Sequence, residues 1–349
     1  MTAKTHLLTP DPEHISYAAM LLTQGQLVGM PTETVYGLAA DAGNDRAVAE
    51  IYAAKGRPSF NPLIVHASDL ATAERIGKFS PDARRLAEAF WPGPLTLVIP
   101  RHDHARISSL VTAGLDTIAI RVPAHPVSQD LLHAFGGVVA APSANISGRI
   151  SPTTARHVLD GLNGQPAAIL DAGPCSIGVE STIIGWQDNT PILLRPGGIP
   201  AETISNCLDH SLTAPASAAS SGHRPAAPGM LSSHYAPTAA VRLNATSVED
   251  GEFLIGFGPI TGDVSLSPSG DLVEAAAKLF GLLHKADASD RPIAIAPVPD
   301  HGLGAAINDR LIRAAAPRQA RPGVPESNTG SIPSAFSACN QTAPGGPKA

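Results

Sequence analysis

The first 208 residues alternate short apolar runs with helical patterns, and this alternation limits the fold more than any other feature of the chain. Asp-Pro-Glu at residues 11–13 combines an N-cap, a proline and an early acid, which is typical of a helix start. Ser-Pro at 80–81 and at 151–152 predicts two further helix starts. Strands are predicted for the apolar runs at residues 27–30, 63–65, 95–99, 117–122, 138–141, 168–170, 182–184 and 192–194. Helices interleaved with short strands indicate an α/β sheet domain over residues 1–208.

The composition changes after residue 208. Residues 209–229 carry almost no large apolar side chain, which predicts a linker. The stretch PGMLSSHYAP then brings large side chains back, namely Met230, Leu231, His234 and Tyr235. A plain tether does not need them, so we expect residues 228–237 to fold over a bound ligand as a lid, within a linker and lid segment that spans 209–237. The alternative is that they only dock the linker against the domain that follows.

Residues 238–317 return to globular patterning and predict a smaller, Rossmann-like α/β domain. Its expected strands are at 253–256 and 293–296, and its expected helices are at 271–284 and 305–316. No GxGxxG motif follows a strand, so no nucleotide fingerprint is predicted here. From residue 318 to 349, Pro, Gly and Ser dominate, which predicts a disordered tail.

Charge and composition narrow the possible functions. Of the 349 residues, 43% are hydrophobic and 15% are charged, so the chain can bury a large core. The formal net charge of −6 argues against a protein that coats nucleic acid or an anionic membrane. The three cysteines show no ligand spacing and indicate neither a zinc site nor a disulfide framework. The N-terminus lacks a signal-peptide pattern, and no apolar run approaches the roughly 20 residues that span a bilayer, so we expect a soluble, cytoplasmic protein.

Polar side chains gather where the predicted strands end. Lys55 and Arg57 flank a glycine that ends a helical pattern, where they suit phosphates or carboxylates but also favour the helix dipole. Arg121 and Arg195 lie in apolar strands, and a buried arginine needs a partner or a ligand. The other candidates are hydroxyl, amide and imidazole side chains: Thr32, Thr34, Tyr36, Asn61, His66, Thr117, Ser143 and Asn145. Each alone is more often a turn or packing residue. Together they predict a pocket for an anionic ligand at the strand ends.

No pair of a nucleophile and a base stands out in the sequence. Cys175 has no evident base nearby, Glu33 and Glu180 are single carboxylates, and no Walker A motif is present. We therefore expect a site that positions charged substrates rather than one that forms a covalent intermediate.

A set of motifs resembles those of one family, the YrdC-type L-threonylcarbamoyladenylate synthases. The motifs are, in chain order, PTETVYGL, KGRPSFNPLIVH, WPGPLT, IAIRVP, APSANISG, ESTII and LLRPGGI. PGMLSSHYAP and GLGAAINDRLIRAAAPR resemble the long, two-domain form of the family, so the resemblance covers residues 10–317. It implies a YrdC-like twisted mixed sheet with a concave cavity, followed by the smaller Rossmann-like domain.

The resemblance also implies an activity and its residues. The family joins L-threonine, bicarbonate or CO2, and ATP into threonylcarbamoyl-AMP, and releases pyrophosphate. The residues implied for L-threonine are Thr34, His66, Arg121, the backbone of Ala141, and Ser181. The residues implied for ATP are Lys55, Arg57, Asn61, Thr117, Ser143, Asn145, Ser151, Arg195 and His234. Lys55 and Arg57 would also be catalytic, because they offset the repulsion between two anionic reactants. Mg2+ is expected to be held by phosphate oxygens and water rather than by a protein site.

The implied product feeds the threonylcarbamoyladenosine modification of tRNA. The expected partners are thus a downstream tRNA threonylcarbamoyl transferase complex and at most a weak tRNA contact, with no membrane. One rival is a carbamoyltransferase that uses carbamoyl phosphate, but such proteins carry further catalytic domains or Cys-rich modules that are absent here. Another rival is a non-catalytic module that binds double-stranded RNA or the ribosome, against which the net charge argues.

Overall fold

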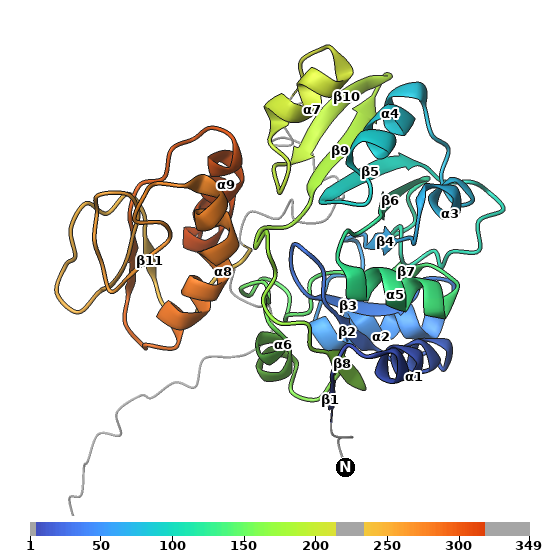
Figure 1. Cartoon of the computed structure of the whole chain (residues 1–349), viewed down its shortest axis with the longest axis horizontal. Helices are drawn as coiled ribbons and strands as arrows, with labels where there is room; N and C mark the ends of the chain where they lie inside the picture. The colour runs from blue at the N-terminus through green and yellow to red at the C-terminus, as the bar shows by residue number, and fades with distance from the viewer. Residues whose placement is uncertain (1–4, 214–233, 318–349) are drawn as a thin grey trace, which may run out of the picture. The chain divides into compact units, whose positions relative to one another are not determined.

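The computed structural model describes residues 5–213 and 234–317 of the chain (Figure 1). The predictions for Met230, Leu231 and residues 318–349 lie outside this range. Residues 5–213 build a ten-stranded mixed sheet with helices, and residues 234–317 build a four-stranded parallel sheet with helices. The α/β class predicted from the sequence is confirmed.

The large sheet mixes parallel and antiparallel neighbours in the order β1-β8-β2-β3-β7-β4-β6-β5-β9-β10. Its strands are β1 (His6–Leu8), β2 (Val28–Met30), β3 (Gly37–Asp41), β4 (Ile64–His66), β5 (Leu95–Pro100), β6 (Thr117–Arg121), β7 (Val139–Ala140), β8 (Ala168–Leu170), β9 (Thr182–Gln187) and β10 (Thr190–Arg195). Its helices are α1 (Pro12–Thr23), α2 (Asp45–Lys55), α3 (Leu70–Glu74), α4 (Pro81–Phe90), α5 (Pro126–Phe135), α6 (Ala155–Leu162) and α7 (Ala201–Leu208). Strands that are distant in sequence are neighbours in this order, so loops from the whole domain meet at one region of the sheet.

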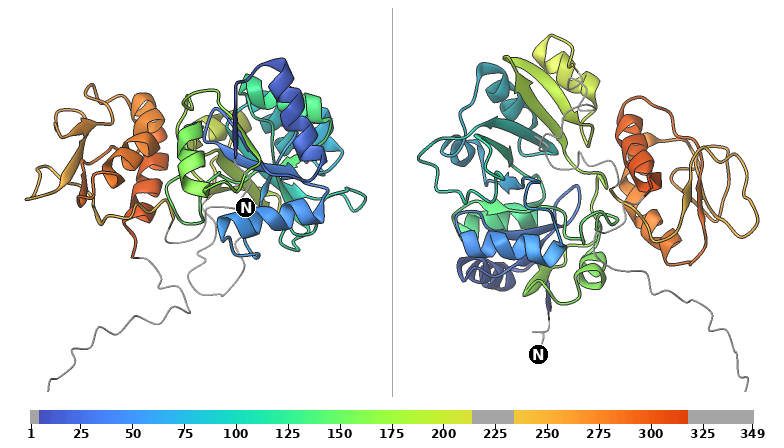
Figure 2. Two further views of the ribbon diagram at one scale, coloured as in Figure 1. Left: turned by 90° about the horizontal axis from the view of Figure 1, so that it is seen from below. Right: turned by 180° about the vertical axis from the view of Figure 1, so that it is seen from behind.

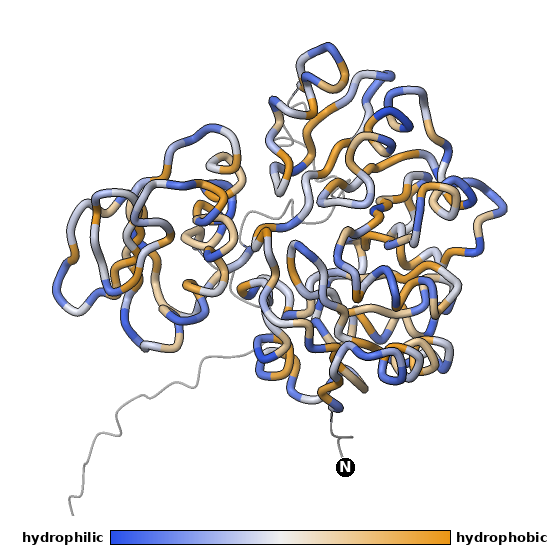
Figure 3. Tube along the Cα trace, viewed as in Figure 1, coloured by the Kyte–Doolittle hydropathy of each residue, from blue (hydrophilic) through white to orange (hydrophobic). Residues whose placement is uncertain are grey.

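Helices cover both faces of the large sheet. Helices α1 and α5 share an apolar core with Val28, Met30 and Ala39. Helix α2 packs with Leu38 and Ala40, which alternate with Ala39 along β3 and therefore face the other way. Figure 2 (left) shows α1 and α2 with the sheet between them. Apolar residues follow the strands and hydrophilic residues follow the connecting loops (Figure 3). A polar site therefore has to lie at the ends of the strands.

Three helix boundaries lie where the sequence predicts them. The Asp11 side chain caps α1 by accepting the His14 N–H at 3.0 Å. The Ser80 hydroxyl caps α4 by accepting the Ala83 N–H at 3.2 Å. Helix α2 ends with Gly56 in the left-handed region, at φ +57°, where glycine has no steric cost. This turn fixes where the chain leaves α2 towards the basic residues of the KGRP motif.

The helix start predicted at residues 151–152 is wrong. Helix α6 begins at Ala155, and its N-cap is Thr154. The Ser151 hydroxyl does not cap this helix, because it donates to the Glu180 carboxylate at 2.6 Å. The Ser151 hydroxyl therefore bonds to Glu180, a residue distant in sequence, instead of capping a helix as the local pattern predicted.

The smaller sheet has the order β11-β14-β12-β13, and every pair in it is parallel. Its elements are β11 (Val241–Arg242), β12 (Phe253–Gly256), β13 (Val264–Ser265), β14 (Ile293–Ile295), α8 (Leu272–Asp287) and α9 (Leu303–Ala315). Its apolar core also contains Val35, Ile150 and Val179, which belong to loops of the large sheet. The small domain is therefore packed directly against these three loops.

No helix in the described part of the chain is long and apolar enough to cross a membrane.

Candidate functional site

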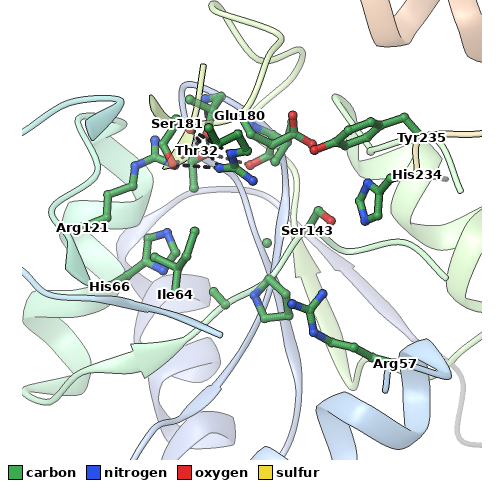
Figure 4. Close-up of a pocket in the computed structure, with 16 residues that line it drawn as sticks. Thr32, Arg57, Ile64, His66, Arg121, Ser143, Glu180, Ser181, His234 and Tyr235 are labelled. Carbon is green, nitrogen blue, oxygen red and sulfur yellow. Dashed lines mark hydrogen bonds between the residues drawn. The ribbon is translucent and has the colours of Figure 1, made fainter. Parts of the chain in front are cut away.

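A cavity lies among the loops at the ends of strands β2, β4, β6, β7, β9 and β10 (Figure 4). The space that is open to water-sized molecules amounts to about 50 Å³. The lining residues are Thr32, Thr34, Val35, Gly37, Arg57, Ile64, His66, Arg121, Ala141, Pro142, Ser143, Glu180, Ser181, Arg195, His234 and Tyr235. The pocket lies where the argument from strand ends placed it.

The start of β3 and the segment that follows β7 lie close together beside the cavity. The Leu38 N–H donates to the Pro142 carbonyl at 2.7 Å, and Gly37 pairs with Ser143 as an isolated bridge. A Cβ on Gly37 would lie 3.1 Å from the Ala141 side chain. Glycine lets the start of β3 lie against the segment that follows β7, and Ala141 and Ser143 of this segment both line the cavity.

Arg121 organises one side of the cavity through three hydrogen bonds. Its guanidinium donates to Glu33 Oε1 at 2.6 Å, to Thr34 Oγ1 at 2.8 Å and to the Gly93 carbonyl at 3.2 Å. Burial alone would raise the pKa of Glu33, but the Arg121 charge outweighs it and holds that pKa below its usual value. Glu33 and Arg121 thus form a buried ion pair, which orients the Thr34 hydroxyl.

His66 lies beside this ion pair and is uncharged. The register of β4 and β6 places His66 opposite Arg121. Burial, helped by the Arg121 charge, lowers the pKa of His66 to about 3. Its Nδ1 atom is buried and has no hydrogen-bond partner among the described residues. A neutral imidazole whose Nδ1 atom has no partner can accept a hydrogen bond from a ligand in the cavity.

Arg57 lies on the other side of the cavity, together with His234 and Tyr235 (Figure 4). The Asn61 carbonyl accepts from Arg57 Nε at 3.1 Å, and Asn61 Oδ1 accepts from Nη2 at 2.7 Å. Burial lowers the pKa of Arg57 to about 10, which leaves the guanidinium charged at neutral pH. Asn61 does not line the cavity, so its present part is to orient Arg57.

Lys55 is placed differently from the expectation. Its ammonium lies outside the cavity lining and donates to the carbonyls of Ser143 and Asn145. Burial, and then the neighbouring Arg57 charge, lower its pKa well below the usual value. Lys55 therefore holds the loop at residues 143–145 in this structure, and a contact with phosphate stays a prediction.

Glu180, Ser181 and Arg195 close the cavity between these two sides. Arg195 donates to the Ser181 carbonyl at 2.9 Å and to Ser181 Oγ at 3.1 Å. Glu180 accepts from Ser151, and the Arg310 charge keeps the pKa of Glu180 below its usual value although burial alone would raise it. Sequence reasoning did not include Glu180 or Glu33 in the site. Their positions in the sequence could have indicated them, because Glu33 directly precedes Thr34 and Glu180 directly precedes Ser181, and both hydroxyl residues were predicted to be in the site.

His234 and Tyr235 belong to residues 234–237, the described part of the predicted lid, and they make two kinds of contact. Both line the cavity, and burial lowers the pKa of His234 to about 3. Their rings meet edge to face at 4.1 Å, and the Tyr235 ring lies 5.5 Å from the Phe280 ring of α8. The His234 N–H donates to the Arg313 carbonyl at 3.3 Å. Contact with the cavity and docking on the small domain, treated as alternatives from the sequence, occur together here.

The predicted site residues fall into three groups. Those that line the cavity are Thr32, Thr34, Arg57, His66, Arg121, Ala141, Ser143, Ser181, Arg195 and His234. Those that instead hold loops or lining residues are Tyr36, Lys55, Asn61, Asn145 and Ser151. Thr117 does neither, because it begins β6 while Arg121 ends it, and the cavity lies at the Arg121 end. The roles of all these residues toward substrates stay predictions.

The charge of the lining suits an anionic ligand. Arg57, Arg121 and Arg195 contribute three cations, whereas Glu180 is the one carboxylate among the lining residues. Within residues 5–213 and 234–317, no three His, Cys, Asp or Glu side chains lie close enough together to hold a metal ion. The three guanidinium groups give the lining a positive charge of the kind that suits phosphate or carboxylate groups.

Comparison with known proteins agrees with the geometry. A model of the Sua5, YciO and YrdC proteins, described as telomere recombination, matches residues 20–197, and a model of the C-terminal domain of threonylcarbamoyl-AMP synthase matches residues 199–316. The threonylcarbamoyl-AMP synthase of Bacillus subtilis is 42% identical over 90% of this chain and 96% of its own length. That of Pyrococcus abyssi is 40% identical over 86% and 93%. The crystal structure of P. abyssi Sua5 with L-threonine superposes with a TM-score of 0.82 at 37% identity, over 89% of this chain and 98% of the other.

Proposed function

Because the chain belongs to the Sua5/YciO/YrdC family and carries the C-terminal domain of threonylcarbamoyl-AMP synthases, we propose that it makes threonylcarbamoyl-AMP from L-threonine, bicarbonate or CO2, and ATP. The observation that carries the proposal is the convergence of three arginines and two neutral histidines, His66 and His234, on a single cavity. Such a lining offers charge to phosphates and carboxylates and an uncharged acceptor to a hydroxyl or amine.

The reaction consists of two bond-forming steps. The neutral amine of threonine attacks the carbon of CO2 and loses a proton, which gives a carbamate. A carbamate oxygen then attacks the α-phosphorus of ATP. The bond between this phosphorus and the oxygen that bridges to the β-phosphate breaks, and pyrophosphate leaves with the electron pair. Both reactants of the second step are anions, so the site has to offset their repulsion.

The lining residues divide this work. Arg57 and Arg195 are the cations that we assign to the nucleotide phosphates, as the resemblance implied. Glu33, Thr34 and Gly93 engage three of the five Arg121 donors, so we assign Arg121 to positioning Thr34 and to offering positive charge and its remaining donors to the threonine carboxylate. Neutral His66 accepts a hydrogen bond and does not act as a proton store, because its pKa of about 3 is too low for that at neutral pH.

Two buried residues, His234 and Tyr235, line one side of the cavity, so a nucleotide that enters from this side has to pass them. We therefore propose that the segment at residues 234–237 moves outward to admit ATP and returns before adenylate forms. Its return excludes water from the mixed anhydride product, which water would hydrolyse.

Magnesium and the downstream steps are parts of the proposal as well. Glu33 and Glu180 are each engaged by an arginine, so a Mg2+ ion would enter on the triphosphate and remain bound to its oxygens. The product would pass to a tRNA threonylcarbamoyl transferase complex with little tRNA contact by this chain. We place the reaction in the cytoplasm, where ATP and tRNA are available.

Pyrophosphate release tests the proposed function directly. The purified chain is mixed with ATP, Mg2+ and bicarbonate, and each amino acid is added in turn. We expect release that requires both threonine and bicarbonate, and a product with the mass of threonylcarbamoyl-AMP. Release that is independent of the amino acid, or the absence of any release with threonine, would contradict the proposal.

A further inference from the structure

Arg310 of α9 reaches the cavity wall from the small domain. Its side chain has no exposed surface. Its Nε donates to Glu180 Oε2 at 2.9 Å, and its Nη1 donates to the Pro196 carbonyl at 2.7 Å and to Asp309 at 2.9 Å. Glu180 precedes β9 and Pro196 follows β10, so one guanidinium joins both ends of this hairpin. The contact crosses 130 positions of the sequence.

Glu180 passes this contact on to the cavity. It lines the cavity itself, and its other carboxylate oxygen accepts the Ser151 hydroxyl at 2.6 Å. The next residue, Ser181, presents its hydroxyl to Arg195 and to Thr96 at 3.1 and 2.7 Å. A shift of Glu180 would therefore move Ser181 and disturb the charge that Arg195 directs at the cavity.

Arg310 also supports the lid residues. The centre of its guanidinium lies 5.4 Å from the centroid of the Tyr235 ring, which is fully buried. Tyr235 has a backbone φ of +60°, which is a strained conformation for a bulky residue and has to be held by its surroundings. One cation thus contacts both a cavity carboxylate and the aromatic ring that covers the cavity.

The backbone around Glu180 is shaped for this docking. A Cβ on Gly178 would lie 2.4 Å from the Ala276 carbonyl oxygen of α8, so only glycine permits this approach. Val179 is fully buried in the core that α8 and α9 form. Residues 178–180 therefore contact both helices of the small domain: the Gly178 backbone packs on α8, and the Glu180 carboxylate binds Arg310 of α9.

We propose that Arg310 is a positioning residue for the reaction: it fixes Glu180, and through it Ser181, and it holds Tyr235 against the cavity, so that the small domain completes the site. This inference rests on the proposed function. The competing view is that the ion pair only stabilises the contact between the two sheets and has no effect on turnover. The charged or titratable groups around Glu180 are Arg310, Asp309, Arg195, His234 and Tyr235.

The first experiment compares Arg310→Lys and Arg310→Gln in the full chain. Lysine keeps the charge but cannot donate to Glu180 and Pro196 in the same fork geometry, and glutamine removes the charge. We expect kcat to fall about tenfold for lysine and about 100-fold for glutamine, since small displacements at a reacting centre have effects of this size. KM for ATP should rise by less than kcat falls, because Arg195 loses the support of Ser181 whereas Arg57, the other cation assigned to the phosphates, keeps its partners.

Arg242→Gln is the matched control. Arg242 pairs with Glu252, a carboxylate of the same domain that is also largely buried, and the pair lies outside the cavity lining. Its loss should lower Tm and leave kcat unchanged. Turnover by Arg310→Lys at wild-type kcat with Tm lowered as in the control would overturn the proposal, and Arg310→Lys keeps this test open if Arg310→Gln does not fold.

A pH profile gives a second and independent readout. Without the Arg310 charge, the buried Glu180 loses its main counter-ion, so its pKa should rise and activity should fall on the acid side of neutrality. The double variant Arg310→Gln/Glu180→Gln has no carboxylate to protonate and should lack this acid limb. Parallel profiles for wild type, single and double variants would contradict the inference. Absence of threonine-dependent pyrophosphate release from the wild type would instead refute the proposed function.

Discussion

Two buried ion pairs flank the cavity, and they differ in the origin of the cation. Glu33 pairs with Arg121 at 2.6 Å, and both residues belong to the large sheet and its loops. Glu180 pairs with Arg310 at 2.9 Å, and this cation comes from the last helix of the small domain. Each carboxylate directly precedes a hydroxyl residue of the cavity. One side of the site is therefore complete within the large domain, whereas the other depends on the small one.

Burial makes both pairs sensitive to the loss of a partner. A buried carboxylate is costly when it is left without a counter-ion, although the intact pair adds little net stability. A buried carboxylate beside the cavity can thus be paired with an arginine of its own domain or with one of the other domain. Substitutions on each side show whether the loss of an arginine has the same effect in both cases.

The largest effect is expected on the self-contained side. Arg121→Ala leaves Glu33 buried and unpaired, which should lower the free energy of unfolding by about 3–5 kcal/mol. Adding Glu33→Gln should restore part of this loss, because the orphaned charge is then gone. Urea denaturation of the single and double variants measures both values. A single variant as stable as the wild type would show that Glu33 finds water or another partner.

Arg57→Ala tests the phosphate side with the large domain left intact. Losing this cation should lower kcat/KM for ATP by an amount equivalent to about 2–4 kcal/mol. Arg46→Ala is the matched control, since Arg46 lies on the preceding helix with its side chain 90% exposed. Near-normal turnover in Arg57→Ala would refute the assignment of Arg57.

Lys55→Ala should behave differently from Arg57→Ala in one respect. Because Lys55 holds the carbonyls of Ser143 and Asn145, its loss should lower Tm as well as turnover. A loss of turnover without a change in Tm would instead favour a direct contact with the nucleotide.

A pH series compares one histidine from each side. His66 and His234 have a folded-state pKa of about 3, against an ordinary value of about 6.5 in the unfolded chain. Their contribution to stability is complete above pH 6.5 and is lost as pH falls towards 3, by at most about 1.4 kcal/mol per pH unit for each histidine. Denaturant unfolding between pH 7 and pH 5 should therefore show a shallower slope in His66→Gln and in His234→Gln. Slopes equal to that of the wild type would show that these imidazoles are not buried as neutral groups.

The smallest effect is expected for a loop arginine that is exposed. Arg149 donates to Thr238 Oγ1 at 3.0 Å, but its side chain faces solvent. Arg149→Ala should change the free energy of unfolding by less than about 0.5 kcal/mol and leave kcat unchanged. A larger loss would mean that the link between loops, rather than burial, makes an arginine important here.

Local patterns were enough to predict the sheet class and several of its boundaries. Asp11, Ser80 and Gly56 act through neighbours within a few positions, so their caps could be predicted. The strand at Gly37–Asp41 was missed because the polar PTETVYG loop runs directly into it. The two-residue strands β11 and β13 are too short to show any periodicity.

The site was predicted from motifs more fully than from chemistry. His66 and Arg121 stand out because they end apolar runs, Arg57 stands out because it follows the glycine that ends a helix, and all three line the cavity. No local sequence pattern predicts the pairing of Glu180 with Arg310, because the two residues are 130 positions apart. Which residues touch the ligand and which hold their neighbours is decided by tertiary contacts of this kind.

The position of Arg310 in the chain has a consequence for biosynthesis. At about 5–20 residues per second, a ribosome takes roughly 7–26 s to add the 130 residues that separate Glu180 from Arg310. During this interval the strands of the large sheet can pair, but Glu180 and Tyr235 both lack their contact with Arg310. A nascent or prematurely ended chain would carry most of the lining and yet lack a finished cavity. Release of a reactive anhydride would then begin only after Arg310 has been added to the chain.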